Sequence, residues 1–124
     1  MEKVNLAQKL SLFSEHWSPK IVGRVNKFEV KVVKLKGEFV WHHHDEEDEL
    51  FFVVKGLLLM KVRDDDGTIR DLWVEEGEFV IIPHMVEHMP VAEEEVHLVL
   101  LEPAGTLNTG NVENERTVKD VPQI

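Results

Sequence analysis

Residues 37–56 read GEFVWHHHDEEDELFFVVKG, and residues 77–88 read GEFVIIPHMVEH. Together they contain four residues that could face one ion: His42, His44, Glu49 and His88. Three imidazoles and one carboxylate can supply the protein ligands of a divalent transition metal. Because residues two apart in a strand point to one face, we expect His42 and His44 on the same side and His43 on the other. The two stretches thus predict a metal site at the ends of separate strands.

The rest of the chain indicates an all-β fold. Segments rich in β-branched and apolar residues alternate with turn signals, at 28–35, 38–44, 49–54, 57–63, 69–74, 78–82 and 96–101. We expect Gly37 to end the first segment and Pro83 to end the sixth. The connections are too short for crossover helices, so the strands should be antiparallel and should form a sandwich or barrel.

The length suits a single domain over residues 1–124. It divides into an N-terminal arm at 1–27, a barrel core at about 28–101 and a C-terminal tail at 102–124. In the arm, Asn5 can cap a short helix whose apolar stripe includes Leu6 and Leu10. The tail is polar and rich in turn formers, so we expect it to be irregular.

The composition argues against several classes of partner. Lys and Arg total 14 against 24 Asp and Glu, and the net charge of −10 would repel nucleic acid and anionic membranes. The absence of cysteine removes disulfides and thiolate ligands. Neither a signal peptide nor an apolar stretch of ~20 residues is evident, so we expect a cytoplasmic protein. The acidic runs at 45–49, 64–66 and 93–95 are expected to be solvated loops, with Glu49 excepted.

Several segments are apolar on both faces, as residues 57–60 illustrate. One face should fill the barrel, and the other needs cover from a second subunit, so we expect a homodimer. Either Leu57 and Leu59 or Leu58 and Met60 lie at the contact, because alternate residues of a strand point to opposite faces.

The two stretches resemble the two signature motifs of the cupin superfamily. The first follows Gly, four residues, His-x-His, four residues, Glu, six residues, Gly; the second follows Gly, five residues, Pro, four residues, His. The resemblance covers roughly residues 28–101, and the whole chain is similar to RmlC-like, single-domain cupins of the cupin_2 type. The family often has five residues before the first histidine, a glycine where Met85 stands and an asparagine where Ala92 stands. These departures affect turn geometry more than ligation.

The resemblance implies an antiparallel double-stranded β-helix whose metal is a divalent transition ion. By position, the ligands would be His42, His44, Glu49 and His88. Ligands without sulfur suit iron, manganese, nickel, cobalt, copper or zinc. Metal binding should weaken as the pH falls through about 6.5, because only neutral imidazole binds metal. In an enzyme, the site would support dioxygenase or isomerase-like chemistry, and Glu49 could leave the metal to act as a base.

Three functions remain compatible with these residues. The first is a metal-dependent cupin that binds or transforms a small organic molecule; the others are a non-catalytic ligand-binding or sensor module and a structural cupin. The chain has no tyrosine, which argues against an epimerase, because cupin-like sugar epimerases generally pair a histidine base with a tyrosine acid. A second acid, base or cation beside the metal would favour catalysis. Lys61 and Arg63 could hold a substrate carboxylate if their strand face points inward.

Overall fold

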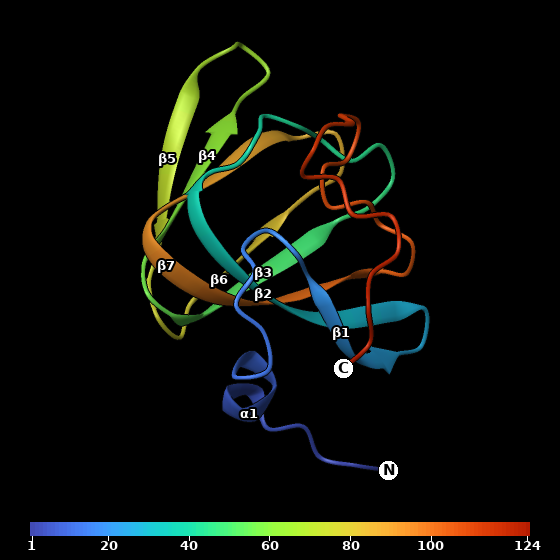
Figure 1. The fold of residues 1–124 in the computed structure, drawn as a ribbon. Coiled ribbons are helices and arrows are strands. Elements are labelled where there is room, and N and C mark those ends of the chain that lie inside the picture. Colours follow the sequence, from blue (N-terminus) through green and yellow to red (C-terminus); the bar gives the residue numbers. More distant parts are fainter.

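The computed structural model describes residues 1–124, which form one short helix and seven strands (Figure 1). The elements are α1 (Leu6–Leu10), β1 (Lys20–Val25), β2 (Phe28–Glu38), β3 (Glu49–Lys55), β4 (Leu58–Arg63), β5 (Ile69–Val74), β6 (Phe79–Ile82) and β7 (Glu87–Pro103). Every strand pair is antiparallel. The all-β, antiparallel fold predicted from the sequence is therefore confirmed.

The long strand β7 connects the two parts of the sheet. Five strands follow the order β1-β2-β7-β3-β6, while β4 pairs with both β7 and β5. The first part of β7 pairs with β4, and the second part pairs with β3 (Figure 1). The segment predicted at 96–101 is thus only the second half of a longer strand. A single curved strand that serves several neighbours brings the ends of distant strands to one place, as a barrel requires.

Alternation along the strands decides which side chains fill the barrel. In β4, Leu58, Met60 and Val62 are buried, whereas Leu57 just before it is exposed and Leu59 is half-buried. Of the two pairs expected at a subunit contact, Leu57 and Leu59 are consequently the outward one. Apolar side chains of β2, β3, β4 and β7, among them Val33, Phe51, Val53 and Leu98, form one buried core. Trp17, which lies outside these strands, also belongs to it.

The chain departs from the predicted strands around Gly37. Gly37 does not end its strand: with a φ of +86° it lies within β2, next to a register shift. Residues 39–48 then lie outside the strands, except for one bridge between His42 and His88. The predicted strand at 38–44 is therefore wrong.

The acidic run at 93–95 is also not a loop. It lies within β7 with its side chains exposed, at the shift in pairing between β2 and β7. A bulged strand accommodates extra residues without breaking the sheet, which lets this acidic run stay extended and solvated.

The two ends of the chain pack on the sheet. Asn5 caps α1 as predicted, since its Oδ1 accepts a hydrogen bond of 2.9 Å from the backbone N–H of Gln8. Leu10 is buried in a small cluster with Val22 and Val32. Strand β1 lies in the segment expected to be only an arm, and the residues after β7 are irregular. The helix α1 lacks the length and apolar character needed to cross a membrane.

Candidate metal centre

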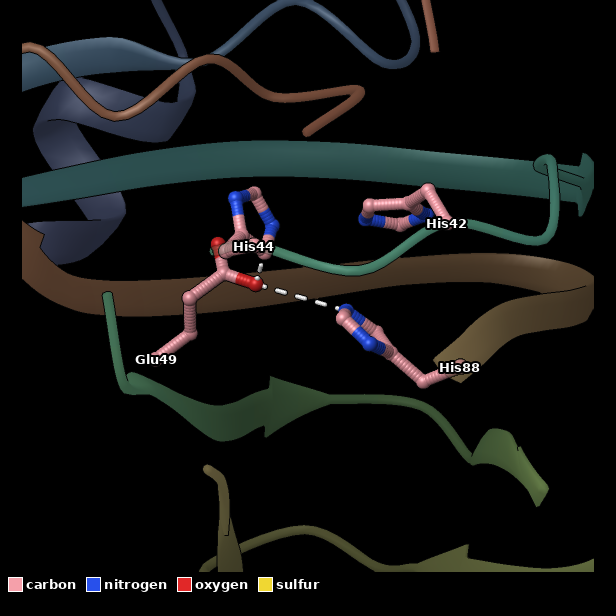
Figure 2. A group of neighbouring side chains, drawn as sticks. All are labelled: His42, His44, Glu49 and His88. Carbon is pink, nitrogen blue, oxygen red and sulfur yellow. Dashed lines mark ion pairs between the residues drawn. The ribbon is translucent and has the colours of Figure 1, made fainter. Parts of the chain in front are cut away.

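Four side chains converge at one end of the barrel (Figure 2). His42 and His44 come from the irregular loop after β2, Glu49 is the first residue of β3, and His88 is the second residue of β7. One donor atom of each lies within 4.8 Å of all the others. Their exposed fractions are 2%, 4%, 3% and 1%, respectively. The four residues singled out from the sequence are thus brought together and buried.

The backbone of the His42–His44 loop is held by two segments, residues 85–88 and the C-terminal tail. His42 and His88 exchange two backbone hydrogen bonds, of 3.1 and 2.9 Å. The carbonyl oxygen of His44 accepts one of 2.7 Å from the N–H of Met85. His43 pairs through its backbone with Asn111 of the C-terminal tail. His43 thus bonds to the side chain and backbone of one asparagine instead of a neighbouring strand, and only the bridge between His42 and His88 resembles sheet pairing.

Local hydrogen bonds fix which ring nitrogen faces the centre. The Nδ1 of His42 donates to the carbonyl oxygen of Val40 at 2.9 Å, and the Nδ1 of His88 donates to that of Val86 at 2.8 Å. With Nδ1 protonated, Nε2 of each neutral ring carries the free lone pair. This arrangement is typical of metal-binding histidines, whose other ring nitrogen is held by a carbonyl or carboxylate oxygen.

The centre contains buried polar atoms that the protein does not satisfy. Glu49 Oε1 lies 2.8 Å from His44 Nε2 and 3.3 Å from His88 Nε2. These contacts are short, but they are not aligned as hydrogen bonds, and all three atoms lack a partner. Buried polar atoms almost always have a partner. A metal ion among them would supply it, so the donor set fits a divalent transition metal.

Burial controls the protonation of the centre. Burial, followed by the neighbouring His88, lowers the pKa of His42 to about 4. The ring therefore stays neutral well below the pH of about 6.5 at which an ordinary histidine protonates. Burial alone would raise the pKa of Glu49, but the neighbouring Glu102 carboxyl group and the contacts with His44 and His88 bring it well below its usual range. The centre thus combines a carboxylate with a neutral imidazole, the forms that bind metal.

A second buried carboxyl group, Glu102, lies beside the centre and was missed by sequence reasoning. Burial and the adjacent Glu49 carboxylate raise the pKa of Glu102 well above its usual range. Its Oε1 accepts a hydrogen bond of 2.7 Å from Lys31 Nζ, whereas its Oε2 is buried without a partner. One signal was available in the sequence: Lys31 alternates with Val33 and Leu35, so a lysine stands on the inward face of a strand.

A cavity lies next to the cluster. The cavity itself has a volume of ≈ 40 Å³, and the space that leads from it to solvent brings the total to ≈ 430 Å³. Apolar side chains form most of its wall, and His42, Glu49, Glu102 and Asn108 contribute its polar groups. Two of the candidate ligands, His42 and Glu49, therefore open onto a small and mostly apolar cavity that leads to solvent.

The irregular loop also changes which aromatic side chain faces the cavity. Regular alternation would turn Phe39 away from His42, yet the Phe39 ring lies edge-on to the His42 ring at 5.4 Å between centroids. Phe39 also stacks on Trp17 at 4.7 Å, and both rings line the cavity. The alternation argument fails here because residues 39–44 are not in a strand.

Other polar residues near the motifs point elsewhere. His43 lies outside the cluster, as predicted, and its ring contacts Asp45 and Glu87 at 3.0 and 3.2 Å. Lys61 and Arg63 have the outward parity of β4: Lys61 pairs with Asp71 at 3.3 Å, and the Arg63 guanidinium stacks on Trp41 at 4.5 Å. Neither basic residue lines the cavity.

The fold and the cluster define a cupin. The family model described as 3-hydroxyanthranilic acid dioxygenase matches residues 3–108, and the chain belongs to this family within the cupin superfamily.

Solved structures support this classification. A cupin-2 domain containing protein from Shewanella frigidimarina is 41% identical over 81% of this chain and 93% of its own, with a TM-score of 0.75. Protein NMB1881 from Neisseria meningitidis is 35% identical over 83% of this chain and 100% of its own, with a TM-score of 0.72. A hydroquinone 1,2-dioxygenase from Sphingomonas sp. TTNP3 shares the fold, with 19% identity over 81% of this chain and 31% of its own and a TM-score of 0.71. No curated protein matches the chain.

Proposed function

We propose that this protein is a metal-dependent dioxygenase that acts on a small, neutral, hydroxylated aromatic compound. His42, His44, Glu49 and His88 would hold the metal. The observation that carries the proposal is the position of the cavity: it is lined by His42 and Glu49 of the cluster and also by a second carboxyl group, Glu102. The family match supports oxygenase chemistry, because the family model is described by a dioxygenase.

Each part of the site has a role in this proposal. A divalent ion held by these three imidazoles and one carboxylate would supply the chemistry that activates dioxygen toward a hydroxylated ring. Phe39, Phe51 and Leu98 are among the apolar residues of the cavity wall. They would pack against a flat ring and exclude water from the reacting atoms. Asn108 would supply a polar contact that orients the ring.

The charge of the cavity supports a neutral substrate. No lysine or arginine lines it, and the buried Lys31 is already paired with Glu102. A substrate carboxylate would have to approach Glu49 and Glu102 without a cationic side chain to pair with it, which is unfavourable in a buried site. The description of the family model names an acid as substrate. Because the cavity offers no basic side chain to such an acid, we propose that this chain acts on an uncharged relative of that ring.

Glu102 is the better candidate for proton exchange with the substrate. Glu49 could act as a base only if it left the metal, whereas Glu102 lines the cavity and does not belong to the ligand cluster. Its raised pKa favours a protonated carboxyl group that can donate a hydrogen bond. A second positioned acid beside the metal favours catalysis over a non-catalytic sensor or structural cupin.

The outer sheet face supports the proposal of a homodimer. Leu57, Trp73, Phe79 and Ile81 are each about half exposed, at 46%, 58%, 59% and 51%. Large apolar side chains that are half exposed to water favour burial against a partner, and a second copy of the chain would bury them. Sedimentation at high micromolar concentration would reveal a dimer; a monomer would remove this part of the proposal.

Oxygen uptake tests the proposed activity. The protein would be loaded anaerobically with Fe²⁺ and mixed with catechol, hydroquinone or 3-hydroxyanthranilic acid. We expect oxygen consumption with a neutral ring, less with the acid, and none with His88→Ala. Faster turnover of the acid would overturn the neutral-substrate proposal. Thermal stabilisation by phenols without oxygen uptake would instead favour the sensor function.

A further inference from the structure

The C-terminal tail crosses the loop that carries His42 and His44 before it returns to β1. After β7 the chain forms irregular turns near this loop and ends beside β1 (Figure 1). Its last residues are held by Ile21, whose N–H donates to the carbonyl oxygen of Pro122 at 2.8 Å and whose carbonyl oxygen accepts from the N–H of Ile124 at 3.0 Å. The tail is thus attached to β7 at its start and hydrogen bonded to β1 at its end.

Asn111 satisfies both backbone groups of His43, the residue between two candidate ligands. The backbone N–H of Asn111 donates to the carbonyl oxygen of His43 at 3.0 Å. The N–H of His43 donates to Asn111 Oδ1 at 2.9 Å. Because His43 is not in a strand, this one asparagine takes the place of a neighbouring strand.

Gly110 lets the tail approach this loop closely. Its φ is +57°, and a Cβ atom there would clash with the carbonyl oxygen of His43 and lie 3.1 Å from Cδ2 of the His42 ring. A side chain at this position would therefore push on both the backbone and a candidate ligand ring.

The rest of the tail holds this turn in place. The hydroxyls of Thr109 and Thr117 are hydrogen bonded at 2.6 Å, and Thr109 is fully buried. Asn108 Nδ2 donates to the carbonyl oxygen of Arg116 at 2.7 Å. The Arg116 guanidinium in turn lies 5.2 Å from the Trp17 ring and donates to the carbonyl oxygen of Glu38 at 2.6 Å. The turn is consequently a packed and hydrogen-bonded structure.

We propose that Gly110 and Asn111 are positioning residues of the metal centre. By holding the backbone of His43, they set the distance and orientation of His42 and His44 and so determine metal affinity. This inference rests on the proposed metal site. It also assigns a role to residues that lie beyond position 108, where the family match ends. Residues that orient metal ligands typically contribute about 10- to 100-fold to metal affinity.

Calorimetric titration of the chelator-treated protein with Zn²⁺ or Mn²⁺ tests this role. We expect Asn111→Leu, which lacks the acceptor, to bind metal on the order of 10- to 100-fold more weakly. Asn111→Asp retains an acceptor and should stay near the wild type. Asn114→Ala is the matched control, because Asn114 bonds to Arg116 within the tail and not to the ligand loop. The melting temperature of the metal-free variants shows whether a change reflects folding alone.

The outcomes separate this inference from the proposed function. Wild-type affinity in Asn111→Leu would overturn the positioning role and leave the metal site intact. A wild-type protein that binds no metal would overturn the proposed function and this inference with it. Gly110→Ala provides a second disturbance of the same loop if Asn111→Leu does not fold, and it too should bind metal more weakly.

Discussion

Two clusters of buried polar side chains lie side by side in this barrel, and they differ in how they are satisfied. Lys31 Nζ lies 2.7 Å from Glu102 Oε1 and 3.7 Å from Glu29 Oε1, so the buried ammonium group has two carboxyl partners. In the second cluster, the candidate metal centre, Nε2 of His44, Nε2 of His88 and Oε1 of Glu49 lie close together but have no hydrogen-bond partner. Because buried polar atoms need partners, the first cluster can be structural by itself, whereas the second requires something from outside the chain.

Glu102 belongs to both clusters. One of its oxygens accepts from Lys31, and the other is buried without a partner beside the cavity that Glu49 also lines. The paired cluster therefore holds one oxygen of Glu102 in place and leaves the other available to a ligand. This comparison suggests four experiments, in order of decreasing effect.

Lys31→Met should have the largest effect on stability, because it removes the cation bonded to the buried Glu102 carboxyl group and leaves Glu29 with Arg24 alone. Breaking one side of a buried ion pair costs about 3–5 kcal/mol of unfolding free energy. Denaturant unfolding of the metal-free protein measures it. The double variant Lys31→Met/Glu102→Leu should recover much of the loss, because it also removes the buried carboxyl group that has lost its partner. A single variant as stable as the wild type would show that this cluster does not depend on its pairing.

Acid should destabilise the metal-free protein through His42. Its pKa is about 4 in the folded protein and about 6.5 in the unfolded chain, so the unfolded state binds the proton first as the pH falls. The full stability is present above pH 6.5, and a loss on the order of 3 kcal/mol should accumulate as the pH falls from about 6.5 to about 4. Denaturant unfolding at a series of pH values measures this loss. His42→Asn should show a flatter pH profile, and an equal slope in both proteins would contradict the assignment.

Removal of one candidate ligand should abolish the stabilisation by metal. His42→Ala, His44→Ala and His88→Ala should each lose bound metal, because each contributes a buried donor atom to the cluster. At a metal concentration of 100 times Kd, the wild type would gain about 2.7 kcal/mol of stability that these variants lack. Elemental analysis and unfolding with and without metal test this. Full metal content in His88→Ala would exclude it as a ligand.

His43→Ala should have the smallest effect. Its ring contacts Asp45 and Glu87 outside the cluster, so its removal should change stability by no more than about 0.5 kcal/mol and leave metal content unchanged. Only the backbone of His43 matters for the metal centre in our interpretation, and an alanine keeps that backbone. If His43→Ala stripped the metal while His44→Ala retained it, the ligand assignment would be wrong.

Much of the fold could be predicted from local patterns. The short strands between turn signals predicted an antiparallel all-β fold, and Asn5 was correctly placed as a helix cap. These features depend on residues close together in the chain, where alternation and capping chemistry act directly. Failures occurred where distant segments decide the conformation. The loop after Gly37 is not a strand, because His43 bonds to Asn111 of the distant C-terminal tail instead of a neighbouring strand, and only His42 forms a bridge.

In the candidate site, too, the sequence predicted the local features, and contacts between distant segments were seen only in the structure. The types and spacing of His42, His44, Glu49 and His88 predicted a set of side chains that the fold brings together and buries, because residue types that can bind metal are read directly from the sequence. Only the tertiary structure decided that Glu102 stands beside them, that Lys31 donates a hydrogen bond to it and that Asn111 holds their loop. The pairing of β2 with β7 brings Lys31 to Glu102, and the returning tail brings Asn111 to His43. Such contacts arise from strand register and chain packing, which no single segment encodes.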